Sequence, residues 1–232
     1  MNAIEVSGLH VWRGEAHVLH GIDITVAAST VTALLGRNGV GKSTTLMAMM
    51  GLLRSSGSVR LAGTDTTGRP THRIALDGVG YVPEDREVFA ALTVAENLRL
   101  SERPGREARY DLVFELFPDL ADRRTQRAGT LSGGQQQMLA LSRALLNPTE
   151  VLLVDEPTKG LAPIIVEQVV EALRRATSDT TVLLVEQNLW VAAELATTAV
   201  VLDQGEVVYR GQMELLSSDA DLAGRYLGVE VR

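Results

Sequence analysis

The sequence predicts an α/β fold in which a mainly parallel sheet carries helices on both faces and is interrupted by a block of helices. A buried strand at residues 31–35 leads through a glycine-rich loop into a helix, and strands alternate with helices after Pro148. Residues 93–146, between these two parts, are mainly helical in pattern. The 232 residues are enough for one such domain with an insert.

The first third of the chain favours strands. The apolar run at 31–35 is strand-sized, and the helix after it is expected at 44–53, with Gly51 and Gly57 marking its exit. Further short strands are expected at 3–6, 22–26, 59–61 and 79–82, and the last three carry β-branched residues between turn signals.

The middle of the chain predicts helices that are separated by proline-containing turns. They are expected at 93–100, 106–116 and 134–146. We therefore predict one domain, 1–232, in which residues 91–147 form a helical subdomain and residues 1–90 and 148–232 form the α/β core.

The last third of the chain returns to alternating strands and helices, which implies parallel strand pairing. Strands are expected at 151–154, 181–185, 199–202 and 206–209, and helices at 164–176 and 189–195.

Composition excludes several classes of function. The net charge of −7 gives no electrostatic footprint for nucleic acid, so no nucleic-acid partner is expected. The absence of cysteine excludes disulfides and thiolate metal sites. The first residues lack a basic segment followed by an apolar run, and no apolar run approaches the roughly 20 residues of a membrane span. Neither a signal peptide nor a transmembrane segment is expected.

The glycine-rich loop fits the pattern G-x-x-x-x-G-K-[ST], which cradles nucleotide phosphates with backbone N–H groups. In this pattern Lys42 reaches the outer phosphates and the Ser43 hydroxyl binds Mg²⁺. The preceding strand and following helix supply the context that the motif requires. The residues predicted to contact nucleotide here are Gly36, Arg37, Asn38, Gly39, Val40, Gly41, Lys42, Ser43 and Thr44.

A second motif, made of two carboxylates, follows the apolar strand at 151–154. Asp155 at the strand end is predicted to organise Mg²⁺ together with Ser43, and Glu156 to hold and polarise a water that attacks the γ-phosphate. Taken alone, these two carboxylates would also suit an acidic turn after a buried strand.

The sequence LSGGQ at 131–135 opens the helix predicted at 134–146. Ser132 is a good N-cap, and the free N–H groups of a helix N-terminus can also face an anion. Together with the phosphate loop and the Asp155-Glu156 strand end, this segment resembles the nucleotide-binding subunits of ABC transporters over nearly the whole chain. The resemblance implies a P-loop NTPase fold with an N-terminal antiparallel β subdomain and an inserted helical subdomain.

Four segments narrow the resemblance. They read YVPEDREVFAALTVAEN at 81–97, LSGGQQQML at 131–139, DEPTKGLAPII at 155–165 and LLVEQN at 183–188. These look like the ATP-binding proteins of branched-chain amino-acid importers, with urea and short-amide importers as close relatives. A soluble ABC ATPase outside transport is a further alternative. The 89 positions between Ser43 and Ser132 leave no room for the long coiled coil of the DNA-repair members.

The resemblance assigns roles to further residues. Each ATP would lie between the phosphate loop of one subunit and the signature of the other, which here is Ser132, Gly133, Gly134 and Gln135. Trp12 would stack on adenine, with Arg13 as the alternative.

Three positions depart from the usual pattern of the family. Glu84 stands where most members have a Gln near the Mg²⁺, and it could still bind the metal. Gln187 replaces a His that contacts the γ-phosphate and cannot carry charge. Ala162 replaces an Asp of the loop that contacts the other subunit.

The partners that the resemblance implies are a second ATP-binding subunit, either a copy or a paralogue, two integral-membrane permease subunits, and an extracytoplasmic solute-binding protein. The chain would then work as a peripheral ATPase on the cytoplasmic face of the inner membrane, with ATP and Mg²⁺ as its ligands.

Overall fold

A computed structural model describes residues 1–228 and contains two sheets. The larger has six strands in the order β10-β9-β3-β8-β7-β6, and only the edge strand β10 pairs antiparallel to its neighbour. The strands are β3 (Val31–Leu35), β6 (Val79–Val82), β7 (Val151–Asp155), β8 (Thr181–Val185), β9 (Thr198–Asp203) and β10 (Glu206–Gln212). Because β3, β6, β7 and β8 run in the same direction, the loops after them meet at one edge of the sheet.

The smaller sheet is antiparallel and has the order β2-β1-β4-β5. Its strands are β1 (Asn2–Arg13), β2 (Ala16–Ala27), β4 (Ser55–Leu61) and β5 (Thr64–Asp65). β1 and β2 are each 12 residues long and extend well beyond the predicted strands at 3–6 and 22–26. Along much of both strands, buried residues alternate with more exposed ones, as expected of antiparallel strands with one solvated face.

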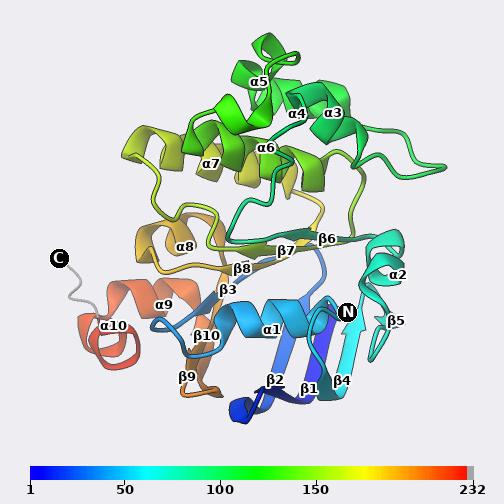
Figure 1. Cartoon of the computed structure of the whole chain (residues 1–232). Helices are drawn as coiled ribbons and strands as arrows, with labels where there is room; N and C mark the ends of the chain where they lie inside the picture. The colour runs from blue at the N-terminus through cyan, green and yellow to red at the C-terminus, as the bar shows by residue number, and fades with distance from the viewer. Residues whose placement is uncertain (229–232) are drawn as a thin grey trace.

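Helix α1 (Lys42–Met49) lies between the two sheets (Figure 1), and one apolar cluster joins both of them to this helix. The helix ends earlier than the predicted 44–53. Gly51, with a φ of 69°, follows its last turn, and a Cβ at this position would lie 2.5 Å from the carbonyl oxygen of Arg69.

On the other face of the large sheet lie α3 (Val94–Arg99), α4 (Tyr110–Leu116), α5 (Pro118–Asp122), α6 (Gly133–Leu145) and α7 (Pro163–Ala176), as Figure 1 shows. A short 3₁₀ turn, Ala128–Thr130, precedes α6. The predicted helix at 106–116 starts only at Tyr110. One apolar cluster joins these helices to β6, β7 and β8. The division of the chain into a core and a helical subdomain stays a prediction.

Four helices were not predicted from the sequence: α2 (Thr71–Leu76), α5, α9 (Met213–Ser218) and α10 (Ala220–Leu227). Each has eight residues or fewer, which is too short for a clear helical period. The helix α8 (Leu189–Leu195) and the strands β3, β6 and β8 have their predicted bounds. Within residues 1–228, no helix has the length and apolar character needed to cross a membrane.

Candidate nucleotide-binding and catalytic site

A cleft of about 590 Å³ opens where the loops after β3, β6 and β7 meet the β1–β2 hairpin. Open α/β sheets bind ligands at this edge because the loops there converge. The cleft is lined by Arg13, Val18, Asn38, Gly39, Gly41, Lys42, Ser43, Thr44, Glu84, Glu156 and Lys159. Most of these residues carry a role that was predicted from the sequence, so the fold brings the phosphate loop and Glu156 into one cavity.

The phosphate loop leads directly into α1. Gly41 is the N-cap with a φ of 114°, and within the described residues no side chain caps this end of the helix. A Cβ on Gly41 would lie 2.5 Å from a methyl carbon of Leu19, so the close approach of β2 requires glycine here. The first N–H groups of α1 therefore remain available to an anion in the cleft.

Lys42 is almost completely buried and is among the residues that line the cleft. Its Nζ donates hydrogen bonds to the carbonyl oxygens of Gly36 at 2.9 Å and Arg37 at 3.0 Å. It also lies 3.7 Å from Glu156 Oε1. Burial lowers the pKa of Lys42, and the nearby carboxylates oppose this shift. An anionic ligand in the cleft would further favour the charged lysine.

Three further residues of the loop, Gly36, Arg37 and Val40, do not line the cleft. The Val40 side chain packs into the apolar core, and its carbonyl oxygen accepts a hydrogen bond from the N–H of Gly205 at 3.1 Å. Arg37 is exposed outside the lining of the cleft. Gly36 has a φ of 142°, and a Cβ there would lie 2.3 Å from the carbonyl oxygen of Leu202. The three positions shape the loop rather than touch the cavity with side chains.

Ser43 and Asp155 form a direct pair. The Ser43 hydroxyl donates a hydrogen bond of 3.1 Å to Asp155 Oδ1. Burial, more than the neighbouring Glu156 and Glu84 carboxylates, raises the pKa of Asp155 to about 6. A hydroxyl and a carboxylate oxygen are the hard ligands that Mg²⁺ prefers, and Mg²⁺ commonly takes its remaining ligands from phosphates and water. The pair therefore fits a metal that arrives with a nucleotide.

Glu156 follows β7 with a φ of 44°, in a left-handed conformation that residues other than glycine rarely adopt. Its Oε1 accepts a hydrogen bond from Gln187 Nε2 at 2.5 Å. Its Oε2 is buried and has no hydrogen-bond donor among residues 1–228, although Lys159 Nζ lies 3.2 Å away as an ion-pair partner. Buried carboxylate oxygens normally have a donor, and a water in the cleft would supply one.

Glu186, which the sequence analysis did not single out, ties the loops after β7 and β8 together. It is buried and accepts hydrogen bonds from the Thr158 hydroxyl at 2.6 Å and from the N–H groups of Gln187 and Asn188 at 3.0 and 3.1 Å. Burial raises its pKa, and these hydrogen bonds oppose the shift. A charged residue directly after the apolar run 181–185 was the only signal that could have indicated this role.

Trp12 lies at the end of β1 next to Arg13, which lines the cleft, and its side chain is about half exposed, so its role as the adenine platform stays a prediction. Its ring stacks on His17 with 4.2 Å between centroids and 6° between planes. In the β1–β2 ladder Val11 pairs with Leu19 and Trp12 with His17, so the bulge leaves Val18 unpaired. Arg13, the alternative for this role, is among the residues that line the cleft.

The signature residues Ser132, Gly133, Gly134 and Gln135 do not line this cleft either. They form the exposed or half-exposed start of α6. Ser132 Oγ accepts a hydrogen bond from the N–H of Gln135 at 3.3 Å, and Gln135 Oε1 accepts one from the N–H of Ser132 at 3.1 Å. The chain therefore brings the phosphate loop to this cleft and holds the signature elsewhere on its surface.

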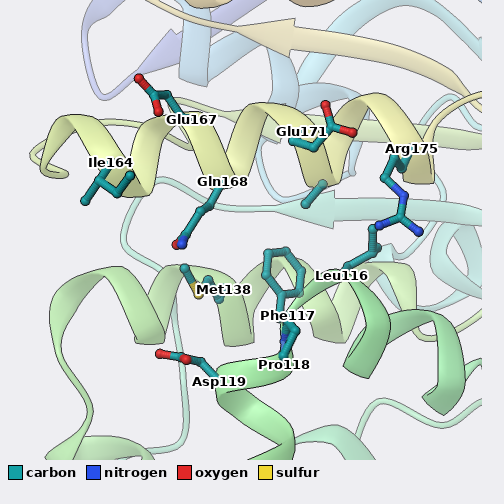
Figure 2. Close-up of a pocket in the computed structure, with 11 residues that line it drawn as sticks. Leu116, Phe117, Pro118, Asp119, Met138, Ile164, Glu167, Gln168, Glu171 and Arg175 are labelled. Atoms are coloured by element: carbon teal, nitrogen blue, oxygen red, sulfur yellow. The ribbon is translucent and has the colours of Figure 1, made fainter.

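A second hollow lies between α6, α7 and the turn from α4 to α5 (Figure 2). Phe117 and Met138 face it, and Gln168 points into it from α7. Its acidic rim includes Asp119, and its one cation, Arg175, is paired with Glu115. This composition is unsuited to phosphate groups, so the nucleotide site is assigned to the first cleft.

Comparisons with known proteins agree with this geometry. A family model described as "ABC transporter" matches residues 19–159, which include the phosphate loop, the signature and Glu156. This chain belongs to the ABC transporter family. The predicted family is thereby confirmed, and the chain is an ABC ATPase with a nucleotide-binding cassette.

Two similar members of the ABC transporter family have names that indicate transport. The "High-affinity branched-chain amino acid transport ATP-binding protein BraG" of Pseudomonas aeruginosa is 42% identical over 93% of this chain and 95% of its own. The "Probable branched-chain amino acid transport ATP-binding protein LivF" of Archaeoglobus fulgidus is 38% identical over 85% and 86%.

A solved nucleotide-free ATP-binding cassette from an ABC transporter has the same fold. It superposes with a TM-score of 0.81 over 96% of this chain and 98% of its own, at 24% identity. The predicted α/β P-loop NTPase fold is thereby confirmed.

Proposed function

We propose that this chain is the ATP-hydrolysing subunit of an importer for branched-chain amino acids. The observation that carries the catalytic assignment is the placement of Glu156, whose Oε1 is held by Gln187 while Oε2 lacks a hydrogen-bond donor among the described residues and adjoins the cleft. The names of the relatives support the substrate, because two of the most similar proteins are branched-chain amino-acid transport subunits.

Bound Mg²⁺–ATP would supply the phosphoryl group and a Lewis acid for its transfer to water. Lys42 and the first N–H groups of α1 would bind the phosphates, and Ser43 and Asp155 would hold the metal. Glu84 lines the same cleft and is the further carboxylate that could reach the metal. Glu156 Oε2 would accept a hydrogen bond from the attacking water and orient it.

The site is proposed to be completed by a second ATP-binding subunit. Ser132 to Gln135 lie outside the cleft of their own chain, so their N–H groups would serve the γ-phosphate bound by the partner. Closure of the two subunits would then move two permease subunits at the cytoplasmic face of the membrane. An extracytoplasmic solute-binding protein would deliver the substrate.

Glu156→Gln tests the catalytic role. The amide keeps the shape of the side chain but cannot accept a proton, so ATP hydrolysis should fall by about 100-fold or more. ATP binding should stay within about threefold of wild type, and ATP-bound dimers should accumulate in light scattering. Glu150→Gln, an exposed carboxylate next to the other end of β7, is the matched control. Hydrolysis by Glu156→Gln at the wild-type rate would remove the assignment.

The substrate is tested separately, because the permeases and the binding protein choose it. Cells that lack this gene should lose uptake of labelled leucine, isoleucine or valine and regain it with the wild-type gene but not with Glu156→Gln. Loss of urea or short-amide uptake alone would move the assignment to that related class. Unchanged uptake of all these solutes would favour a soluble ABC ATPase outside transport.

A further inference from the structure

Lys159 occupies a special place in the composition of this chain. The sequence contains only two lysines, Lys42 and Lys159, and every other basic side chain with a permanent charge is arginine. Both lysines contact the same carboxylate, that of Glu156. Lysine and arginine differ in shape and hydration, because the ammonium group is a compact point charge and the guanidinium is a broad planar fork.

The ammonium group of Lys159 lies between two carboxylates that come from different loops. Its Nζ is 2.5 Å from Glu84 Oε1, on the loop after β6, and 3.2 Å from Glu156 Oε2, on the loop after β7. The backbone closes the same turn, since the N–H of Lys159 donates to the carbonyl oxygen of Glu156 at 3.2 Å. Lys159 therefore links two loops that are 75 positions apart in the sequence.

We propose that Lys159 is a positioning residue that neutralises Glu84 and holds Glu156 Oε2 toward the cleft. The proposal rests on the proposed function of Glu156. Its distinct content is that Glu84 and Lys159 act as a matched pair, in which the lysine neutralises the carboxylate at position 84 beside Glu156.

The geometry favours positioning over a purely structural role. Lys159 is 54% exposed, and exposed ion pairs contribute little to folding stability. Glu156, in contrast, is only 6% exposed. The contact of Lys159 with Oε2 attracts this oxygen, and a carboxylate oxygen has two lone pairs, so it can still accept a hydrogen bond from water.

The neighbouring charges leave no substitute for Lys159 among the described residues. Lys42 lies closer to Oε1 of Glu156, at 3.7 Å, and donates its hydrogen bonds to loop carbonyls. Arg13, the remaining cation of the cleft lining, has no ion pair with Glu84 or Glu156 in residues 1–228. Without Lys159, the carboxylates of Glu84 and Glu156 would face each other and the phosphates of the ligand.

A double-mutant cycle on the full chain tests this pairing. Lys159→Met should lower kcat by about tenfold with KM for ATP changed by less than about threefold, because orientation of the water is lost more than binding. Glu84→Gln in the Lys159→Met background should raise kcat by about threefold or more above that of Lys159→Met alone, since no unpaired carboxylate remains at position 84. Lys159→Arg should recover more activity than Lys159→Met because it retains the cation.

A second measurement, by NMR of labelled lysine side chains, does not depend on ATP hydrolysis. Labelling lysine at Cε with ¹³C gives only two lysine side chains to resolve, because the chain has only two lysines. In the nucleotide-free protein, Glu84→Gln should shift the Lys159 signal and leave that of Lys42 nearly unchanged. Loss of the signal in Lys159→Met assigns it.

Two results would overturn the proposal. One is an additive cycle, in which Glu84→Gln fails to rescue Lys159→Met. The other is an unshifted Lys159 signal in Glu84→Gln. Either could occur while Glu156→Gln is still inactive, so the proposed ATPase function would stand without this inference. Wild-type hydrolysis by Glu156→Gln would instead remove the function itself.

Discussion

Helices α1 and α6 both begin at glycine-rich loops, but the two starts are built differently. At α1 the N-cap is Gly41, no side chain among the described residues caps the first turn, and a buried lysine stands at the first helical position. At α6 the N-cap is Ser132, which forms a reciprocal capping box with Gln135. The first start is partly enclosed in the cleft, and the second is exposed or half-exposed.

This difference fits the proposed division of phosphate binding between the two helix starts. The start of α1 leaves its donors to the ligand and adds the charge of Lys42, so it can bind phosphate by itself. The start of α6 satisfies part of its own hydrogen bonding and carries no cation at positions 132–135. It is therefore suited to recognise a phosphate that another subunit already holds.

Lys42→Ala should have the largest effect of these substitutions. It should weaken ATP binding at the start of α1 and leave the start of α6 unchanged. Removing the buried ammonium group takes away the main countercharge to the phosphates, so ATP affinity should drop by about 100-fold or more. Calorimetric titration of nucleotide into the purified chain measures this. Near wild-type affinity would mean that the backbone of α1 alone carries phosphate binding.

Ser132→Asp should separate the α6 side from nucleotide binding. Aspartate also caps helices well, so stability should change by less than about 1 kcal/mol. Its negative charge, however, would face the phosphate of the partner, and hydrolysis should fall by about 100-fold. ATP affinity of the isolated chain should not change, and Ser132→Asn is the uncharged control. Weakened binding by the isolated chain would contradict the division between the two helices.

Glycine-to-alanine substitutions compare the two loops in stability. Gly41→Ala requires a strained φ and meets Leu19, so it should cost about 2–3 kcal/mol in urea unfolding. Gly134→Ala places its Cβ 3.0 Å from Ile165, against a gain of helix propensity, so its net effect should stay within about 1 kcal/mol. Equal costs at the two positions would show that the α6 loop is as tightly held as the α1 loop.

Acid should destabilise the β1–β2 hairpin through its histidines. This hairpin contributes Leu19, which lies close to Gly41 at the start of α1. Burial lowers the pKa of His17, and the charges of His20 and His10 lower it further. The unfolded chain then binds more protons near pH 6.5, so stability present above that pH is lost as the pH falls.

His17→Gln should therefore show a smaller drop in Tm between pH 7.5 and 5.5 than wild type, by a few degrees at most. The exposed His72, changed to Gln, is the control. Identical drops in wild type and His17→Gln would mean that the acid effect arises elsewhere.

The elements that the sequence predicts best are those whose pattern needs no tertiary information. Strands β3, β6 and β8 are continuous apolar runs between turn residues, as buried parallel strands require. The phosphate loop has a recognisable spacing of glycines and a lysine, which can be read from the sequence alone. The strand end at Asp155 and Glu156 follows from the same sheet geometry.

What the sequence left open depends on contacts between distant segments. The stacking of Trp12 on His17 depends on the bulge at Val18, which no local pattern indicates. The pairing of Glu84 with Lys159 joins loops that only the sheet brings together. Helices such as α5 and α9 are short and gain their stability from packing rather than from propensity.

The buried carboxylate of Glu186 has a consequence for motion. Because it accepts hydrogen bonds from Thr158 in one loop and from Gln187 and Asn188 in the next, neither loop can open without breaking its bonds. The amide hydrogens of these three residues should therefore exchange with solvent through one shared opening, with one free energy. The catalytic turn at Glu156 and the glutamine that holds it would then open and close as a unit.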